Sequence, residues 1–261
     1  MISRTGFYPN FIALSTLLWK EILRFTRIWS QTIIPPAITM SLYFLVFGKF
    51  IGSQIKPIEQ VTYLQYIVPG LVMMSVMTSA YANTSSSFFL TKFNKSIEEM
   101  LVSPMPNYII LLGFMLGGTI RGLLVGVMVM MVALFFTHVP IYHPWIVLIM
   151  SILSAMVFAL AGLINGIYAK RFDDISFIPT FVLTPLTYLG GVFYSIHQLP
   201  PFWRMISLFN PILAIVDTFR YGLLGITDLN VYIGFTLVNF LFILLFCWAW
   251  ILLYKGTRIK V

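Results

Sequence analysis

The feature that most limits the fold of this chain is a series of long apolar runs separated by short polar segments. The hydrocarbon core of a bilayer is about 30 Å thick, so a helix that crosses it needs about 20 predominantly apolar residues. Six runs of that length cover residues 30–51, 63–90, 108–136, 145–168, 175–194 and 231–254. Only 9% of the 261 residues are charged, against about 25% in an average soluble domain. The sequence therefore predicts an all-α polytopic membrane protein with six transmembrane helices in a single domain over residues 1–261.

The first segment, residues 11–29, differs from these runs because it carries charged residues at helical spacing. Its basic residues are Lys20, Arg24 and Arg27, and the apolar residues on another face are Leu18, Ile22, Phe25 and Trp29. Four charges within eight residues are costly inside a bilayer, whereas a basic amphipathic helix suits the membrane interface. We therefore expect an N-terminal interfacial amphipathic helix over 11–29, with a seventh span as the alternative.

The distribution of basic residues predicts the orientation of the chain. Cytoplasmic segments of membrane proteins are enriched in Lys and Arg, which also contact anionic lipid. With both termini in the cytoplasm, the inner segments carry eleven of the sixteen basic residues, the outer segments carry four, and Arg121 falls within a span. This bias predicts cytoplasmic N- and C-termini. The basic residues flank spans and form no single patch, so the net charge of +8 does not indicate nucleic-acid binding.

A polar stretch, KSIEEMLVSPMP from Lys95 onward, interrupts the apolar runs on the predicted cytoplasmic side. Ser96 followed three residues later by Glu99 has the form of a capping box, and Pro104 stops a helix at the residue before it. These signals predict a short amphipathic helix over 96–103, too short to cross the bilayer. Its acidic residues are Glu98 and Glu99, and its apolar residues are Ile97, Met100 and Leu101.

Charged residues are almost absent from the interior of the six runs. No Asp or Glu lies well inside any of them, and Asp173 and Asp174 fall in a predicted cytoplasmic loop over 169–176. Transporters driven by protons or sodium commonly use intramembrane carboxylates, so this absence disfavours that class. Arg121 is the one clear intramembrane charge. It is interpreted either as a contact for a substrate or lipid headgroup, or as a structural arginine near the inner interface.

Glycine and proline predict how the helices pack and bend. Glycines at small-residue spacing, at positions 113, 117, 118, 122 and 126 and again at 162 and 166, predict close approach of neighbouring helices. Pro179 and Pro185 predict a kink in the run 175–194, whose freed carbonyl groups then need other partners. Residues 195–227 are apolar but broken by Pro200, Pro201 and Pro211 and charged at Arg204, Asp217 and Arg220. This pattern predicts a re-entrant helical hairpin in the outer leaflet.

Motifs for enzyme or metal chemistry are not apparent. The phosphate-binding pattern GxxxxGK[ST] does not occur in the sequence. His138 and His143 are five residues apart, whereas four would place two ligands on one helical face, and Cys247 is the only cysteine. We therefore expect no cofactor and no metal in this chain. A function as an intramembrane enzyme or scaffold would need a convergent nucleophile and base, which the sequence does not offer.

Taken in order, these features resemble the membrane subunits of type-2 ATP-binding-cassette (ABC) exporters, and the resemblance covers nearly the whole chain. Its most specific part is the stretch from Phe172 to Gly225. The residues that match the family signature are Leu189, Gly190, Gly191, Leu199, Pro200, Asn210, Pro211 and Arg220. Ala214 departs from the pattern, since the family often has a polar or aromatic residue three positions after this proline, and it weakens the motif slightly.

The resemblance implies a division of labour between two proteins. A separate cytoplasmic ABC ATPase would bind ATP and magnesium and hydrolyse ATP, while this chain forms the substrate pathway across the bacterial inner membrane. Two such permeases with two ATPases imply a homodimer of this chain or a pseudo-symmetric dimer. The residues matched to an ATPase-coupling helix are Glu98, Glu99, Met100, Ser103 and Pro104, and a second contact would be formed by Asp173 and Asp174.

The substrate and its pathway are less constrained. Polar residues within apolar runs are candidate pathway residues, namely Asn83, Arg121, Asn165, Thr184 and Tyr188. The short loops favour a small amphipathic molecule or a lipid-linked solute as the transported species. The alternative function is a secondary transporter or channel that works without an ATPase partner, and it predicts gradient-driven flux in the absence of ATP.

Overall fold

All of the elements in the computed structural model are helical. The model describes residues 7–52, 54, 61–103 and 105–256. The elements are α1 (Phe7–Arg27), α2 (Trp29–Tyr43), η1 (Phe44–Ile51), α3 (Tyr63–Phe93), α4 (Ser96–Val102), α5 (Asn107–Phe136), α6 (Pro144–Tyr168), α7 (Phe172–Ile178), η2 (Pro179–Leu183), α8 (Thr184–Tyr188), η3 (Ile196–Gln198), α9 (Pro201–Leu208), α10 (Pro211–Leu224) and α11 (Val231–Lys255). The predicted all-α class is confirmed.

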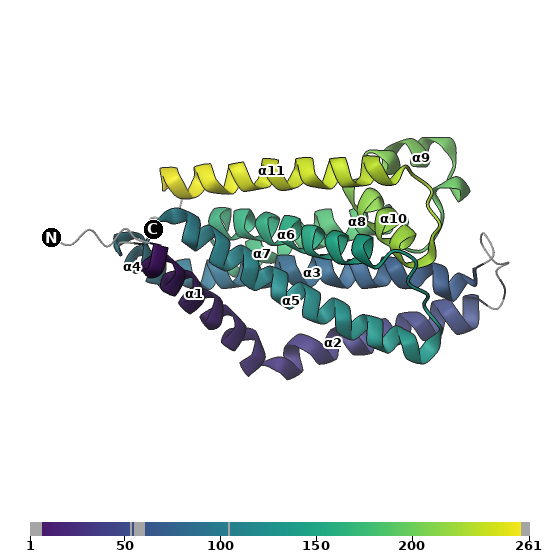
Figure 1. The fold of residues 1–261 in the computed structure, drawn as a ribbon, viewed down its shortest axis with the longest axis horizontal. Helices are drawn as coiled ribbons and strands as arrows, with labels where there is room; N and C mark the ends of the chain where they lie inside the picture. Colours follow the sequence, from purple (N-terminus) through teal and green to yellow (C-terminus); the bar gives the residue numbers. More distant parts are fainter. Residues whose placement is uncertain (1–6, 53, 55–60, 104, 257–261) are drawn as a thin grey trace.

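Helix α3 is the centre of the bundle. It packs most extensively against α6 and α5, and α11 covers α6 from the other side. Figure 1 shows these long helices running side by side, with α1 and α2 meeting at an angle along one edge. The start of α1, helix α4 and the end of α11 lie at one end of the bundle, and α9 and α10 lie at the other. These are called the α4 end and the α9 end below.

The helix lengths fit a polytopic membrane protein. Five described helical segments are long and apolar enough to cross a membrane, or six if the bent pair of α9 and α10, which meet at 84°, is one span. The predicted run 175–194 is not among the five. It forms α7, η2 and α8, which end at Tyr188, because Pro179 and Pro185 interrupt regular α-helical bonding. The membrane position of α1 and of the α9–α10 pair stays a prediction.

Close helix packing at the glycines is confirmed. On α6, a Cβ at Gly162 would overlap the main-chain carbonyl oxygen of Tyr81, and one at Gly166 would lie 3.0 Å from that of Ser85, both on α3. On α5, Gly117 faces the side chain of Glu21 in α1, where an added Cβ would come within 2.7 Å of the glutamate Cβ. Small residues thus let the main chains of α3, α5 and α6 approach closely.

The predicted break in the helical run is also present, whereas a change of helix direction there stays a prediction. Residues Pro179–Leu183 form a π-helical turn, and the hydroxyl of Thr184 donates a hydrogen bond to the carbonyl oxygen of Pro179 (3.0 Å). The main-chain N–H of Thr184 donates to the same carbonyl oxygen, so the wider π-helical turn leaves this carbonyl group bonded within the segment. The Thr184 hydroxyl is therefore hydrogen-bonded within its own helical segment.

Candidate functional site

Helix α4 forms a short amphipathic element directly after α3. Ile97 is fully buried on its inner side, and Met100 and Leu101 are half-buried against the core. On its outer side Glu99 is exposed, and 88% of the Val102 surface is exposed. Glu98, Glu99, Val102 and Ser103 line a shallow depression in the surface. Apolar contacts therefore hold the helix against the bundle, and its acidic surface faces outward.

The start of α4 differs from the predicted capping box, which is wrong. The N-cap residue is Lys95, with φ 59° and ψ 4°, and no side chain caps the helix. The hydroxyl of Ser96 donates to the carbonyl oxygen of Thr91 (3.1 Å), because the left-handed turn at Lys95 folds Ser96 back onto the last turn of α3. The predicted end is confirmed: Ser103 is extended, with φ −65° and ψ 156°. Pro104 lies outside the described residues.

The second acidic loop is attached to the same end of α3. The ring of Phe172, at the start of α7, contacts those of Phe89 (4.9 Å between centroids) and Phe93 (5.3 Å). The ammonium group of Lys92 donates to the carbonyl oxygens of Ile167 (2.8 Å) and Ala169 (3.0 Å) at the end of α6. Helix α4 and the loop before α7 are therefore both coupled to the last two turns of α3.

The two aspartates of this loop have different surroundings. Asp174 Oδ2 accepts hydrogen bonds from the main-chain N–H groups of Lys170 (2.8 Å) and Arg171 (3.0 Å). These bonds hold the pKa of the Asp174 carboxyl below its usual range. Asp173 is exposed at the start of α7. Asp174 therefore orders the loop, and Asp173 is the aspartate of the pair that faces outward.

The signature residues come together at the α9 end, around the buried Arg220. Its Nη2 donates to the carbonyl oxygen of Gly191 (2.6 Å), its Nε donates to that of Tyr66 (3.4 Å), and its Cζ lies 4.0 Å from the centre of the Tyr66 ring. Gly191 has φ +66°, a conformation that glycine adopts without strain. Arg220 thus ties α10 to the turn after α8 and to the first turns of α3.

The acidic partner of Arg220 is Asp217, one turn earlier on α10. The pair is separated by 3.6 Å, and only 2% of each side chain is exposed. Asp217 also accepts hydrogen bonds from the Thr227 hydroxyl (2.6 Å) and from the N–H groups of Asp228 and Leu229 (both 2.9 Å). The carboxylate therefore fixes the connection between α10 and α11.

Asn210 and the remaining signature residues shape the turns of this cluster. The amide of Asn210 accepts from the N–H of Ile212 (3.0 Å), which caps α10, and donates to the carbonyl oxygen of Leu186 (2.6 Å). A Cβ at Gly190 would lie 2.7 Å from Ile212. Pro200 precedes α9, and Pro211 opens α10. In this structure the signature is an assembly of helix caps, close approaches and one buried ion pair.

The five candidate pathway residues are not brought together. Asn165 is buried, where its amide donates to Ser85 (3.2 Å) and to the carbonyl oxygen of Ile175 (3.1 Å), so that it joins α6 to α3 and α7. Thr184 and Tyr188 are exposed on α8. Asn83 is fully buried and Arg121 is half-buried, and these two residues are hydrogen-bonded to each other.

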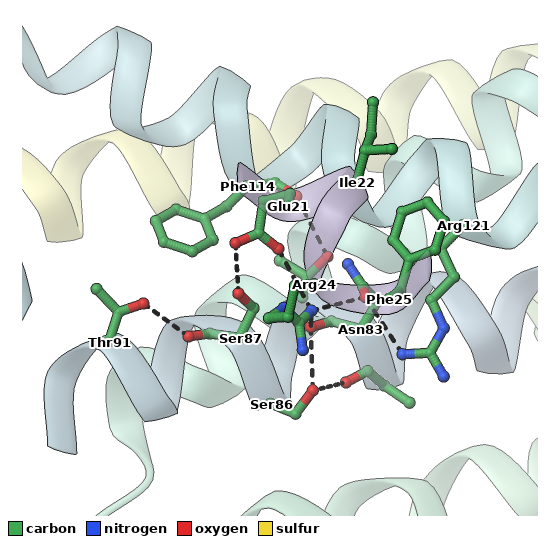
Figure 2. A network of polar contacts seen from close by, with 12 residues as sticks. Glu21, Ile22, Arg24, Phe25, Asn83, Ser86, Ser87, Thr91, Phe114 and Arg121 are labelled. Carbon is green, nitrogen blue, oxygen red and sulfur yellow. Dashed lines mark hydrogen bonds and ion pairs between the residues drawn. The ribbon is translucent and has the colours of Figure 1, made fainter. Parts of the chain in front are cut away.

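Figure 2 shows the network around Asn83, which includes residues that the sequence argument missed. Glu21 on α1 is fully buried and forms an ion pair with Arg24 (3.3 Å). The Ser87 hydroxyl on α3 donates to the other oxygen of that carboxylate (2.6 Å). The spacing of Glu21 and Arg24, three residues apart on a helix, was the available signal. The interfacial interpretation of 11–29 treats all of its charges alike, whereas Glu21 is buried against α3.

One strip of α3 stays uncovered although the helix is otherwise largely buried. The strip consists of Met74, Thr78, Ala82, Ser86 and Leu90, each of which is half-buried or exposed. Its middle residues are small or polar, unlike the exposed apolar side chains of α11 such as Phe240 (62% exposed) and Ile243 (60%). A surface of this kind is better suited to a protein neighbour or a polar solute than to lipid.

Comparisons with known proteins agree with this architecture. A model of the family described as ABC-2 type transporter matches residues 12–224. The inner membrane transport permease YadH of Escherichia coli (strain K12) is 50% identical over 250 residues, which are 95% of this chain and 97% of that protein. The chain belongs to the ABC-2 type transporter family. Nodulation protein J of Rhizobium leguminosarum bv. viciae is more distantly similar, with 26% identity over 197 residues, 73% of this chain and 74% of that protein.

The ABC-2 type transporter match covers most of the clusters described above. Residues 12–224 include most of α1, the whole of α4, the loop before α7 and the signature residues up to Arg220. The chain is thus a multi-pass membrane protein of a transporter family, and the resemblance drawn from its sequence is confirmed.

Proposed function

We propose that this chain is the permease subunit of an ABC exporter in the bacterial inner membrane, driven by a separate cytoplasmic ATPase. The observation that carries the proposal is the form of α4. It is anchored by the fully buried Ile97, it presents Glu99 and Val102 outward, and it continues directly from α3. An element of this kind can transmit the movement of a docked protein to the centre of the bundle.

The α4 end is the cytoplasmic end in this proposal. Glu98, Glu99 and Asp173 offer carboxylates to basic or amide groups of the ATPase, and complementary charges of this kind fix the register of a protein interface. ATP and magnesium belong to that partner, and this chain acts without a cofactor or a metal of its own. Both termini then lie in the cytoplasm, as the excess of basic residues on that side indicates.

The uncovered strip of α3 supports a homodimer with a pathway between the two copies. Thr78, Ala82 and Ser86 are small residues on the uncovered side of an otherwise buried helix, and the hydroxyls of Thr78 and Ser86 donate to carbonyl oxygens of their own helix (both 2.7 Å). A strip of small residues of this kind allows a neighbouring helix to approach closely. Thr184 and Tyr188 lie on the exposed surface of α8 and are further candidates for the wall of this pathway. The transported molecule is proposed to be a small amphipathic compound or a lipid-linked solute.

The buried carboxylates favour this function over secondary transport. Among the described residues, the buried acidic residues are Glu21 and Asp217. Each forms an ion pair, with Arg24 (3.3 Å) and Arg220 (3.6 Å) respectively. A carboxylate that already neutralises an arginine is a poor site for a coupling proton or sodium ion.

Charge reversal on α4 tests the proposed function. With the permease co-purified in nanodiscs with its candidate ATPase, Glu98→Lys combined with Glu99→Lys is expected to lower permease-dependent ATP hydrolysis at least about tenfold. The reason is that like charges placed across an interface cost several kcal/mol, and about 1.4 kcal/mol is already a factor of ten. The measurement is the ATPase rate together with the amount of ATPase retained on the tagged permease.

A matched control adds positive charge away from α4. Gln198→Lys, at an exposed residue of the α9 end, is expected to leave both the rate and the retention unchanged. The proposal is wrong if the doubly reversed variant retains and stimulates the ATPase as the native chain does. It is equally wrong if the native chain retains no nucleotide-binding subunit at all.

A further inference from the structure

Two arginines from different helices meet at one amide oxygen in the network of Figure 2. The Nη2 atom of Arg24 on α1 and the Nη1 atom of Arg121 on α5 both donate to Asn83 Oδ1, at 2.7 Å and 3.2 Å. Arg24 also donates to the main-chain carbonyl oxygen of Asn83 (3.1 Å). Because both guanidinium groups bond to the same oxygen atom, two positive charges are held close to each other.

The charges of this network do not balance. Glu21 is the acidic member, and both of its oxygens are engaged, one by Ser87 (2.6 Å) and the other by Arg24 (3.3 Å). Glu21 therefore offsets one of the two guanidinium charges. Arg121 has no acidic partner among the residues that the structure describes. A positive charge in a low-dielectric setting is costly without a counter-charge.

The network also holds N–H donors without acceptors. The Nδ2 atom of Asn83, the Nε atom of Arg24 and the Nε atom of Arg121 are all buried and have no hydrogen-bond partner, and the Asn83 side chain is fully buried. Buried donors are nearly always paired in folded proteins, because a buried donor without an acceptor loses its hydrogen bond to water and gains none in return. One site thus combines surplus positive charge with unused donors.

We propose that Arg24, Asn83 and Arg121 hold an oxyanion of the phosphate class, presented by the head of an amphipathic molecule. A phosphate group has several acceptor oxygens and matches the fork of a guanidinium group, so it can satisfy two arginines at once. Two basic groups beside a single carboxylate also favour an anion over a cation or a neutral ligand.

The site lies toward the α4 end of the bundle. Asn83 lies ten residues before the end of α3 at Phe93, or about 15 Å along the helix axis at 1.5 Å per residue. This places the arginines in the membrane half at the α4 end and beside Ala82 and Ser86 of the uncovered strip. The phosphate belongs to a membrane lipid or to the transported solute, and in the second case the site deepens the function proposed above.

The test is a binding measurement on the full-length permease alone, delipidated in neutral detergent. Phosphatidylglycerol, diacylglycerol and inorganic phosphate are titrated separately, with binding followed by native mass spectrometry and microscale thermophoresis. We expect phosphatidylglycerol to bind and diacylglycerol not to bind. Arg121→Gln is expected to weaken phosphatidylglycerol binding by about tenfold or more, because it removes a guanidinium group whose charge-assisted hydrogen bonds to the phosphate are strong.

Arg27→Gln is the matched control, since Arg27 is an exposed basic residue of the same α1 helix, and it should bind as the native chain does. Equal binding by the native chain, Arg121→Gln and Arg27→Gln would overturn the proposal, as would binding of diacylglycerol equal to that of phosphatidylglycerol. Binding of inorganic phosphate that Arg121→Gln abolishes would support the same site with a soluble source of the anion.

A second variant keeps the test decisive if Arg121→Gln does not fold. Arg121→Lys retains the charge but cannot reach both Asn83 and a phosphate oxygen with a planar fork. It is expected to bind phosphatidylglycerol several-fold more weakly than the native chain, and undiminished binding would contradict the proposal. No ATPase is present in these experiments, so their outcome is independent of whether α4 docks a nucleotide-binding subunit.

Discussion

Replacing Arg220 with alanine is expected to lower the free energy of unfolding by about 3–5 kcal/mol, the usual cost of breaking a buried ion pair from one side. The variant would leave the Asp217 carboxylate buried without its counter-charge and would remove the donors that hold Gly191 and Tyr66. We expect most of the protein to be lost from the membrane fraction. The remainder should unfold at a lower denaturant concentration in detergent.

Arg204→Ala is the control for Arg220→Ala, because Arg204 is an exposed arginine of the same α9 end. Surface substitutions of this kind usually change stability by less than about 0.5 kcal/mol. Arg220→Lys should fall between the two, since a lysine keeps the charge but not the planar set of donors. Native-like stability of Arg220→Ala would show that the signature cluster does not hold the α9 end together.

Replacing Gly162 with alanine is expected to force α6 away from α3. The new methyl group would overlap the carbonyl oxygen of Tyr81, and a main-chain atom cannot rotate aside as a flexible side chain can. Overpacking of this kind costs about 1–3 kcal/mol and occasionally more. The expected result is a clear drop in the melting temperature of the purified permease.

Gly166→Ala provides a graded comparison on the same face of the same helix. The nearest atom to its added Cβ would be the carbonyl oxygen of Ser85 at 3.0 Å, so a smaller displacement relieves the contact. The loss of stability should therefore be greater for Gly162→Ala than for Gly166→Ala. The reverse order, or no loss in either variant, would mean that the approach of α6 to α3 is looser than described.

The hydropathy pattern predicted much of the fold because transmembrane helices have few alternatives. Helix α3 begins at Tyr63 and α11 begins at Val231, where the corresponding apolar runs begin, since every main-chain polar group in a bilayer must be bonded within its own helix. The glycines predicted close packing for a similarly direct reason. Without a side chain, they determine how near two helical axes can come.

The parts that the sequence did not reveal depend on tertiary contacts. Glu21 looks like an interfacial charge until α1 packs on Gly117 and brings its carboxylate to Ser87. The start of α4 depends on the left-handed turn at Lys95. A lysine at this position does not predict a left-handed conformation. The signature around Arg220 could be recognised as a motif, but the contacts of Arg220 with Tyr66 and Gly191 needed the fold, because residues 66, 191 and 220 are distant in sequence.

The most direct test of a permease driven through α4 is a site-specific cross-link to its ATPase. Cys247 is the only cysteine, so Cys247→Ser gives a background in which Val102→Cys, at a position 88% exposed on α4, is the sole thiol. With a short thiol-to-amine cross-linker, this variant should form a covalent adduct with the co-expressed ATPase. Phe135→Cys, at a position 89% exposed near the end of α5 at the α9 end, should form none. An adduct at Val102→Cys alone is the predicted result, and equal adducts at both positions, or none at Val102→Cys, would contradict the account.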